Sequence, residues 1–283
     1  MRVLVTGSQG MLGRDLCRIF GESHEVLGVD LEGMDVRDPE AVLDVAVDFQ
    51  PDLFVHLAAM TNVDACEEQP DEAYRSNTIG TRNVVLACRR LEAVFVLLST
   101  GAVFDGEKSE PYLEYDPPNP QSVYGRSKQG AEQIVQSMLS RYYIVRAGWM
   151  FGGGPADKKF VAKIVELAKE REELRVVNDK VGSPTYTVDL SRGLVDLVES
   201  DLYGIYHMTN QGWCSRDALA RYILECAGIN GCQVVPVSSD EYPLPAPRPN
   251  MEALRNLALE LSGLPLLPPW EEAIERYLKE TLL

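Results

Sequence analysis

The sequence predicts an α/β protein with a doubly wound parallel sheet and a smaller C-terminal lobe that binds a substrate. Two observations support this fold class. Short apolar runs that suit buried parallel strands alternate with helical periods over the first half of the chain. The first run leads directly into a glycine-rich loop and a helix, over residues 7–20. Because such sheets bind ligands at the carboxyl ends of their strands, we expect the functional site along that edge.

Length and composition limit the possible classes. The 283 residues suit one large domain or two lobes. We expect a nucleotide-binding domain over residues 1–149 and about 186–209, with a substrate-binding lobe over 150–185 and 210–283. The formal net charge of −16 disfavours nucleic acid and anionic membranes as partners. Because no signal peptide and no long apolar run are evident, we expect a cytoplasmic protein.

The six cysteines and three histidines show no metal-ligand spacing. This pattern favours reduced thiols and predicts no zinc site.

The first strand is expected over Arg2–Thr6, followed by the glycine loop Gly7–Gly13 and a helix through Phe20. Glycines let the backbone approach a pyrophosphate, which then rests on the free N–H groups of the helix N-terminus. An ordinary strand-to-helix turn is the alternative interpretation. If the loop binds a dinucleotide, the expected contacts are Gly7, Gln9, Gly10, Met11 and Leu12.

The second strand, Glu25–Val29, ends at Asp30, about 20 residues after the loop. An acid at this place hydrogen-bonds the adenosine ribose hydroxyls and repels a 2′-phosphate. The sequence therefore favours NAD(H) as the cofactor. Arg14 or Arg37 would soften this preference, so NADP(H) stays possible.

Asp35 and Val36 lie in a loop that is expected to contact the adenine edge, before a helix over Pro39–Phe49. A simple N-cap turn for that helix is the alternative. The third strand, Leu53–Leu57, contains His56, which we expect to be a core residue. Small residues after this strand would let a ribose or nicotinamide lie against the backbone. The cofactor contacts expected here are Leu57, Ala58, Ala59 and Thr61.

A helical segment from Glu72 to Arg90 carries a polar residue, Asn77. We expect Asn77 on the cofactor side, where its side chain would support a kink or a water path near Lys128. A surface position is the alternative.

The fourth strand, Val94–Leu98, ends in Ser99 and Thr100, and Tyr124 and Lys128 follow. A Tyr and a Lys at this spacing lie on one face of a helix, one turn apart. A phenol has a pKa of about 10 and needs a neighbouring cation to transfer protons near neutral pH. Thr100 would share a substrate carbonyl with the phenol. We therefore expect Thr100, Tyr124 and Lys128 to be catalytic, with Ser99, Tyr124 and Lys128 also contacting the cofactor; an exposed helix pair is the alternative.

The rest of the chain gives weaker patterns. The loop 107–123 is rich in proline and acids and is expected to cover the site. The further elements expected are a helix continuing to 141, a strand at 143–147, a loop at 151–155, a helix at 159–171, a strand at 174–178, a helix at 189–200, a strand at 204–209, a helix at 215–227, a proline-rich segment and two short helices.

Taken together, the motifs resemble those of the extended short-chain dehydrogenases, and within them the dTDP-4-dehydrorhamnose reductases, over nearly the whole chain. The motifs that carry the resemblance are Thr-Gly-x-x-Gly-x-x-Gly at 6–13, Ala-Ala-x-Thr at 58–61, Ser-Thr at 99–100, Val-Phe-Asp-Gly at 103–106, Tyr-Gly-x-Ser-Lys at 124–128, Arg-x-x-Trp at 146–149 and Gly-Ser-Pro-Thr at 182–185.

The resemblance implies a Rossmann fold and an oxidoreductase that uses NAD(P)H to reduce the C4 ketone of dTDP-4-dehydrorhamnose to dTDP-L-rhamnose. It implies the catalytic roles of Thr100, Tyr124 and Lys128. Arg248, with Lys158 or Lys159, is expected at the substrate diphosphate, with solvated surface charges as the alternative. The residues expected on the substrate side are Val103, Phe104, Trp149 and Arg248.

The chain departs from the family pattern at two places. Gly101 and Ala102 stand where members usually have Asp-Tyr, and the segment 247–252 lacks the usual Asn-Ser pair. Some members hold a dimer-bridging Mg²⁺ with glutamates. Only Asp15 resembles such a position here, so no metal is predicted. A monomer and a homodimer both stay open.

Two other functions also stay open. One is a non-catalytic NAD(P)-binding regulatory subunit of the methionine adenosyltransferase type, favoured by the missing acid and phenol after Thr100. The other is a reductase or epimerase of another nucleotide sugar. The complete Thr, Tyr and Lys set favours an enzyme.

Overall fold

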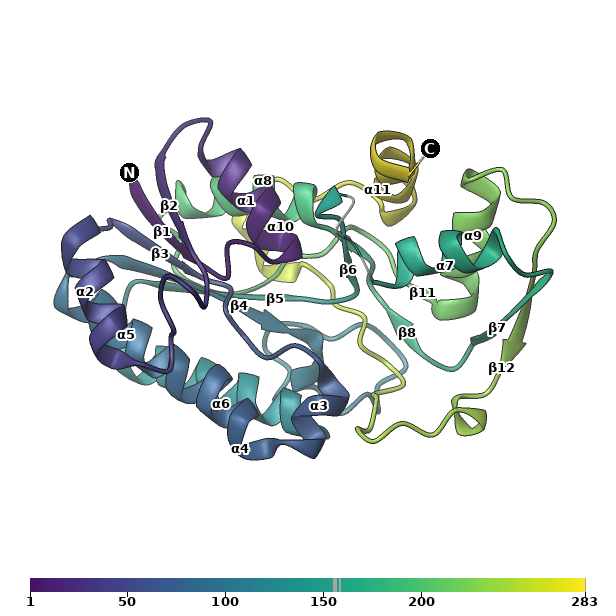
Figure 1. The fold of residues 1–283 in the computed structure, drawn as a ribbon, viewed down its shortest axis with the longest axis horizontal. Coiled ribbons are helices and arrows are strands. Elements are labelled where there is room, and N and C mark those ends of the chain that lie inside the picture. Colours follow the sequence, from purple (N-terminus) through teal and green to yellow (C-terminus); the bar gives the residue numbers. More distant parts are fainter. Residues whose placement is uncertain (155–156, 158, 283) are drawn as a thin grey trace.

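The computed structural model describes residues 1–154, 157 and 159–282. Its centre is a six-stranded sheet in the order β10-β5-β4-β3-β1-β2, in which every neighbouring pair is parallel (Figure 1). The strands are β1 (Arg2–Thr6), β2 (Glu25–Val29), β3 (Leu53–His56), β4 (Val94–Thr100), β5 (Tyr142–Ala147) and β10 (Gly204–His207). The predicted doubly wound fold is confirmed. Strands β2 and β3 lie on opposite sides of β1, so the order in which strands are added to the sheet reverses at β1. This reversal opens a crevice beyond the carboxyl ends of β1 and β3.

Helices cover both faces of the sheet (Figure 1). One face carries α1 (Met11–Phe20), α8 (Thr187–Val198) and α10 (Leu257–Ser262), and the other carries α2 (Pro39–Phe49), α5 (Gly80–Arg90) and α6 (Val123–Met138). The short helices α3 (Val63–Glu68) and α4 (Pro70–Tyr74) precede α5. Each face has its own apolar core. Because both faces are covered, the strands are apolar without alternation, as the sequence indicated.

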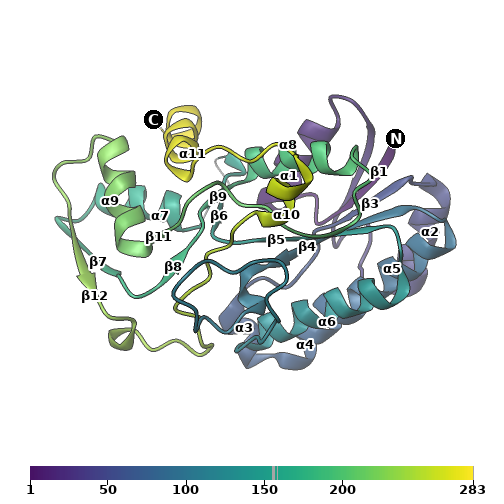
Figure 2. The ribbon, with the colours of Figure 1, turned by 180° about the vertical axis from the view of Figure 1, so that it is seen from behind.

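The C-terminal lobe lies at one end of the sheet (Figure 2). It has its own apolar core, which Ile19 and Val188 of the neighbouring helices also join. Its main elements are α7 (Phe160–Ala168), β7 (Glu173–Val177), α9 (Arg216–Cys226), β12 (Gln233–Val237) and α11 (Trp270–Tyr277). Two small strand pairs belong to the same half: β6 (Met150–Phe151) with β9 (Thr185–Tyr186), and β8 (Val181–Gly182) with β11 (Cys214–Ser215).

Sequence patterns missed β12, as they missed α3 and the short strands β6, β8, β9 and β11. Strand β12 contains Pro236, which normally argues against a strand because proline has no backbone N–H to donate. Within the described part of the chain β12 pairs with β7 alone, so the proline nitrogen can face away from the ladder. The pairing partner lies about 60 residues earlier in the chain, which no local pattern reveals.

The helical segment expected over Glu72–Arg90 is irregular at Asn77. Residues Arg75–Ile79 form a π-helical turn between α4 and α5, and Asn77 within it is fully buried. The alternative of a surface position is therefore wrong.

Among the residues described, no helix combines the length and apolarity needed to cross a bilayer. All six cysteines are free thiols, and each is buried or half-buried.

Candidate active site

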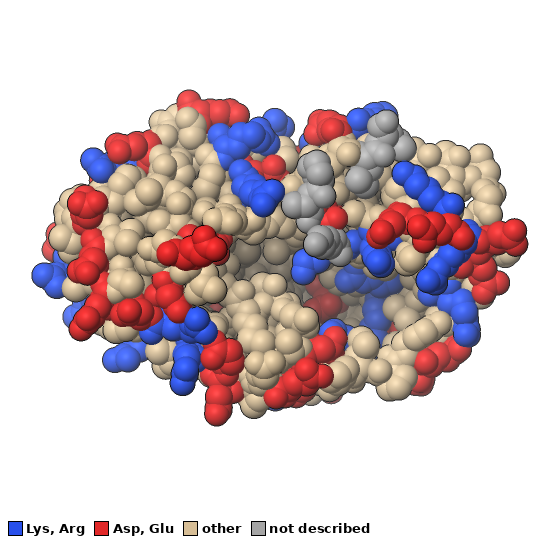
Figure 3. Space-filling model, viewed as in Figure 1, with Lys and Arg blue, Asp and Glu red and all other residues tan. Residues whose placement is uncertain are grey.

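A cleft of about 860 Å³ lies between the carboxyl edge of the sheet and the C-terminal lobe. Figure 3 shows this hollow near the middle of the molecule, with Lys and Arg side chains gathered on its lobe side. The cationic residues that line it are Arg37, Lys128, Lys159, Arg216 and Arg248. A local basic surface inside a strongly acidic protein suits an anionic ligand.

The glycine loop forms one end of the cleft. Gly7 has a φ of +71°, and its carbonyl accepts a hydrogen bond from the Gly10 N–H at 3.1 Å. A Cβ at Gly13 would lie 2.3 Å from the Gly7 carbonyl oxygen, so only glycine lets α1 start this close to the loop. Helix α1 has no side-chain cap at Gly10. Its first N–H groups therefore stay available to an anion such as a pyrophosphate.

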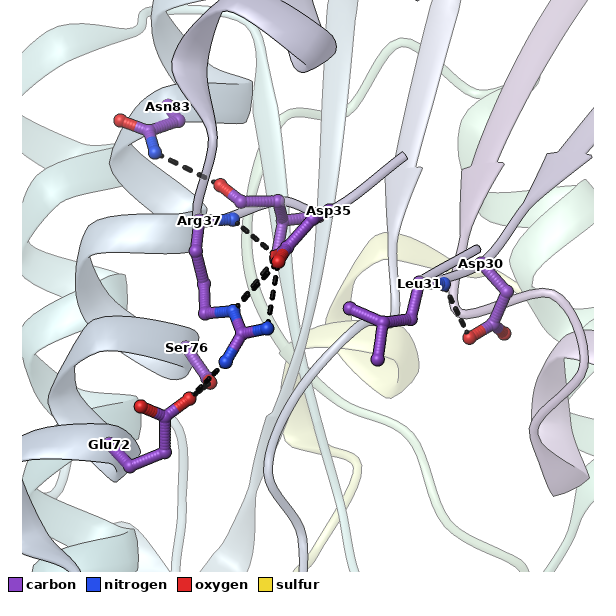
Figure 4. Close-up of polar contacts among 8 residues, drawn as sticks. Asp30, Leu31, Asp35, Arg37, Glu72, Ser76 and Asn83 are labelled. Carbon is purple, nitrogen blue, oxygen red and sulfur yellow. Dashed lines mark hydrogen bonds and ion pairs between the residues drawn. The ribbon is translucent and has the colours of Figure 1, made fainter. Parts of the chain in front are cut away.

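Asp30 and Asp35 lie in the same end of the cleft (Figure 4). The Asp30 carboxylate accepts the Gln9 N–H at 3.0 Å and the Leu31 N–H at 2.9 Å. Asp35 is paired with Arg37, whose guanidinium also pairs with Glu72. Hydrogen bonding by Arg37 lowers the pKa of the Asp35 carboxyl. Arg37 is thus already held by two carboxylates.

The structure brings nearly all the expected cofactor residues onto the wall of this cleft. Those that line it are Gly7, Gln9, Gly10, Met11, Leu12, Asp30, Asp35, Val36, Leu57, Ala58, Ala59, Thr61, Ser99, Tyr124 and Lys128.

Asn77 is the exception. Its amide oxygen accepts the Met60 N–H at 2.7 Å, and its amide nitrogen donates to the Met60 carbonyl at 3.1 Å and to the Ser127 hydroxyl at 2.9 Å. Contrary to the expectation of a cofactor contact, Asn77 lies behind the cleft wall. It is a positioning residue that ties the segment after β3 to the helix carrying Tyr124.

Thr100, Tyr124 and Lys128 all line the cleft. Helix α6 begins beside the end of β4, with the Ser122 hydroxyl accepting the Gly125 N–H at 3.1 Å as its N-cap. A Cβ at Gly125 would lie 2.2 Å from the Ala102 carbonyl oxygen, so glycine allows this close approach. Tyr124 and Lys128 lie one turn apart on the face of α6 that lines the cleft.

Burial shifts the pKa values of Tyr124 and Lys128 in the directions that favour the neutral form of each side chain. Burial raises the pKa of Tyr124 to about 12, although a hydrogen bond with Thr100 opposes the shift. Burial lowers the pKa of Lys128 to about 8, and the charge of Glu132 opposes that shift. At neutral pH the phenol is protonated and the ammonium is charged, which is the state needed to deliver a proton to a substrate oxygen.

His56 takes no part in this chemistry. Its ring bridges the hydroxyls of Thr6 at 2.8 Å and Thr81 at 3.1 Å inside the core. Burial, with a contribution from the Lys128 charge, lowers the pKa of His56 to about 3. The prediction of a core histidine is confirmed.

A buried ion pair supports the site from below, and sequence patterns did not identify it. Glu132 lies one turn after Lys128 and accepts two hydrogen bonds from Arg146 on β5, at 2.9 and 2.7 Å. The Ser99 hydroxyl donates to the same carboxylate at 2.5 Å. Ser99 therefore lines the cleft while its hydroxyl points to Glu132. The sequence signals for this pair were the motif at 146–149, which contains Arg146, and the four-residue spacing of Glu132 from Lys128.

Trp149 and Arg248 line the lobe side of the cleft, as expected. Trp149 has a φ of +45°, an uncommon backbone conformation for a large side chain. Its indole N–H donates to Glu252 at 3.2 Å. Arg248 pairs with Asp64 at 2.8 Å and also donates to the Ala246 carbonyl at 2.8 Å.

Val103 and Phe104 do not reach the cleft. Both are fully buried and pack with Tyr112, Met251 and Leu254 in a small core under the site. Contrary to the expectation of a substrate contact, they hold the turn after Thr100 against the segment 251–254.

The loop 107–123, all of which the structure describes, also differs from expectation, because Ser122 is its one residue on the cleft wall. Pro247, Arg248, Pro249 and Glu252 supply that wall instead. Lys159 lines the cleft, whereas Lys158 lies outside the described residues. Sequence reasoning missed Arg216, which lies in no recognised motif, and Glu252, which lies in the segment 247–252 that departs from the family pattern.

No cluster of three or more metal-ligating side chains occurs within residues 1–154, 157 and 159–282. Asp15 accepts the Gly153 N–H at 3.1 Å and the Thr187 hydroxyl at 2.5 Å. It thereby joins α1 to α8 and to the loop after β6.

The chain resembles known proteins over its full length. The family model described as the RmlD substrate binding domain matches residues 1–283. The spore coat polysaccharide biosynthesis protein SpsK of Bacillus subtilis is 38% identical over 99% of this chain and 97% of its own. A dTDP-4-dehydrorhamnose reductase of Mycolicibacterium smegmatis is 35% identical over 97% of this chain and 84% of its own. A crystal structure of dTDP-4-dehydrorhamnose reductase from Bacillus anthracis in complex with NADP has 38% identity and a TM-score of 0.95, covering 99% of both chains.

Proposed function

The chain belongs to the family described as the RmlD substrate binding domain, and on this basis we propose that it uses NAD(P)H to reduce dTDP-4-dehydrorhamnose to dTDP-L-rhamnose. The observation that carries the proposal is that Thr100, Tyr124 and Lys128 share one cleft with the glycine loop. The relatives named dTDP-4-dehydrorhamnose reductase cover almost the whole chain, which supports the same reaction here.

The cleft suits a nicotinamide dinucleotide. The loop at Gly7–Gly13 forms a cradle that any Cβ at Gly13 would fill, and the uncapped N-terminus of α1 faces it. Asp30 would hold the adenosine ribose, and Lys128 the nicotinamide ribose. When bound, the nicotinamide supplies the hydride for C4 of the sugar.

The side chains of the protein bind the oxygen at C4 and supply its proton. Thr100 and Tyr124 would both hydrogen-bond this oxygen, which polarises the ketone. Tyr124 gives its proton to the alkoxide as it forms. The Lys128 ammonium stabilises the phenolate that remains. Arg248 and Lys159 would attract the diphosphate, although Arg248 must share its charge with Asp64.

The first test is a direct assay. We expect NADH and NADPH absorbance to fall when dTDP-4-dehydrorhamnose is added to the protein, with dTDP-L-rhamnose as the product by mass spectrometry. Tight cofactor binding without turnover would support the regulatory alternative, which draws on the absence of polar side chains at Gly101 and Ala102. Turnover of a different nucleotide sugar would support the other alternative.

We also propose that NADH is the preferred cofactor. Asp30 would repel a 2′-phosphate, and Arg37 is already held by Asp35 and Glu72. The relative from Bacillus anthracis, in complex with NADP, supports use of NADPH as well. We expect kcat/KM to be higher with NADH than with NADPH, and Asp30→Ser to shift the ratio toward NADPH by about 10-fold, the equivalent of about 1.4 kcal/mol. Asp38→Ser, which changes the exposed N-cap acid of α2, should leave the ratio unchanged.

The charge of Lys128 predicts a pH dependence. With a pKa of about 8, Lys128 is charged below that pH and neutral above it. We therefore expect kcat/KM to be constant from about pH 6 to 7.5 and to fall as the pH rises through about 8. A pH profile under conditions where chemistry limits the rate measures this. An activity that keeps rising to about pH 10 would contradict the proposed role of Lys128.

We further propose that the two lobes bind different ligands. Residues 1–149 and about 186–209 bind the cofactor, and the remaining segments bind the sugar nucleotide. The C-terminal lobe's own apolar core supports this division. A cytoplasmic location and a monomeric or homodimeric state complete the proposal.

A further inference from the structure

Gly101 and Ala102, which directly follow Thr100, bring no polar side chain to the cleft wall. The segment 252–254 packs into the space this leaves. A Cβ at Gly101 would lie 3.0 Å from the Glu252 carbonyl oxygen and 3.6 Å from the Leu254 side chain. The absence of a side chain at Gly101 thus lets the backbone of Glu252 approach the end of β4.

Glu252 is held firmly in this position. Its N–H donates to the Val181 carbonyl at 2.8 Å, and the Val181 N–H donates to the Asn250 carbonyl at 2.8 Å. Met251, the preceding residue, is buried in the core under the site. The backbone of Glu252 is therefore fixed relative to β8, and its side chain lines the cleft.

The carboxylate of Glu252 faces the catalytic end of the cleft. The other carboxylates that line it, Asp30 and Asp35, belong to the cofactor end. One oxygen of Glu252 accepts the Trp149 indole N–H at 3.2 Å, and the second oxygen has no hydrogen-bond partner among the described residues. Burial is the main cause of the raised pKa of the Tyr124 phenol, and the charge of Glu252 adds to that shift.

Arg216 completes the arrangement on the far side of Trp149. Its guanidinium stacks over the Trp149 ring at 3.5 Å. Burial lowers the pKa of Arg216 to about 10, and the charge of Glu252 opposes that shift. The indole is therefore fixed at its face by a cation and at its edge by Glu252. A ring held in this way keeps the direction of the carboxylate constant.

We propose that Glu252 selects the substrate by accepting a hydrogen bond from the sugar hydroxyl next to the reacting carbonyl. The inference rests on the proposed function, in which Tyr124 protonates the oxygen at C4. Of the two ring carbons bonded to C4, C3 carries a hydroxyl and C5 carries the methyl group. The 3-hydroxyl is thus the donor that a carboxylate beside Tyr124 can reach. Trp149 acts as a positioning residue for Glu252.

The test compares dTDP-4-dehydrorhamnose with its 3-deoxy analogue in the wild-type protein and in Glu252→Gln. A hydrogen bond to a charged acceptor predicts that the wild type prefers the natural substrate by about 10- to 100-fold in kcat/KM. Glu252→Gln should reduce this preference to about threefold or less, because the charged acceptor is gone. The KM for NADH and NADPH should stay unchanged in the variant.

Glu260→Gln is the matched control, since Glu260 pairs with Arg255 outside the cleft and should leave the preference for the 3-hydroxyl unchanged.

The outcomes separate the two proposals. If the wild type turns over neither sugar, the proposed function fails. If the wild type is active and Glu252→Gln keeps the full preference for the 3-hydroxyl, the role of Glu252 is overturned and the reductase stands. If Glu252→Gln changes the melting temperature, Trp149→Phe is measured instead. This variant loses the indole N–H that holds Glu252, together with part of the ring over which Arg216 stacks, and should weaken the same preference.

Discussion

Replacing Tyr124 by phenylalanine is expected to lower kcat for sugar reduction by about 100- to 10,000-fold, the usual contribution of a positioned general acid. The phenol is the group that meets Thr100 and faces the cleft one turn before Lys128. Phenylalanine keeps the ring and its packing against α3 and the cleft wall, so the cofactor should still bind. Stopped-flow measurement of NADH oxidation at saturating substrate tests this expectation.

Tyr115→Phe is the control for that experiment. Tyr115 is 73% exposed and lies outside the cleft, so loss of its hydroxyl should leave kcat unchanged. Cofactor affinity measured by fluorescence should be the same in both variants. If Tyr124→Phe retained wild-type turnover, another group would have to supply the proton, and the proposed chemistry would be wrong.

Replacing Glu132 by alanine is expected to lower the free energy of unfolding by about 3–5 kcal/mol. Glu132 and Arg146 are both buried, and the arginine would be left as an unpaired charge between α6 and the sheet. Ser99 would lose its hydrogen-bond acceptor as well. Urea unfolding followed by circular dichroism measures the change.

A matched surface pair provides the comparison. Glu260→Ala breaks the ion pair with Arg255, which is exposed, and should cost less than about 1 kcal/mol. Should Glu132→Ala fail to fold, Glu132→Leu combined with Arg146→Met removes both charges and should recover most of the stability. A loss below about 1 kcal/mol in Glu132→Ala would show that water or a rearranged side chain compensates Arg146.

Much of the site was predictable because its signals are local. The glycine loop, the acid at Asp30 and the Tyr124–Lys128 pair each depend on the spacing of a few neighbouring residues. A parallel sheet then brings the carboxyl ends of its strands together, so the residues directly after each strand make up much of the cleft wall. Asp30 and Thr100 are correctly placed for this reason.

The site predictions that disagree with the structure concern the direction in which a side chain points. Val103 and Phe104 come a few residues after Thr100, yet a short 3-10 turn at Gly101–Val103 directs them into the core. The sequence placed Asn77 on the cofactor side of its helix, but the π-turn directs its amide to the backbone of Met60. Local spacing does not contain these orientations, because they depend on which element packs against each turn.

The sequence alone determined the fold class, and it predicted the glycine loop and the proposed catalytic set of Thr100, Tyr124 and Lys128, since each can be read from periodicity or spacing within one segment. Only the tertiary structure decided which residues support and border them. Arg146 reaches Glu132 from a neighbouring strand, and Glu252 reaches Trp149 from about 100 residues further along the chain. Such pairs form because packing of the whole chain brings their segments together, and no local pattern fixes that distance.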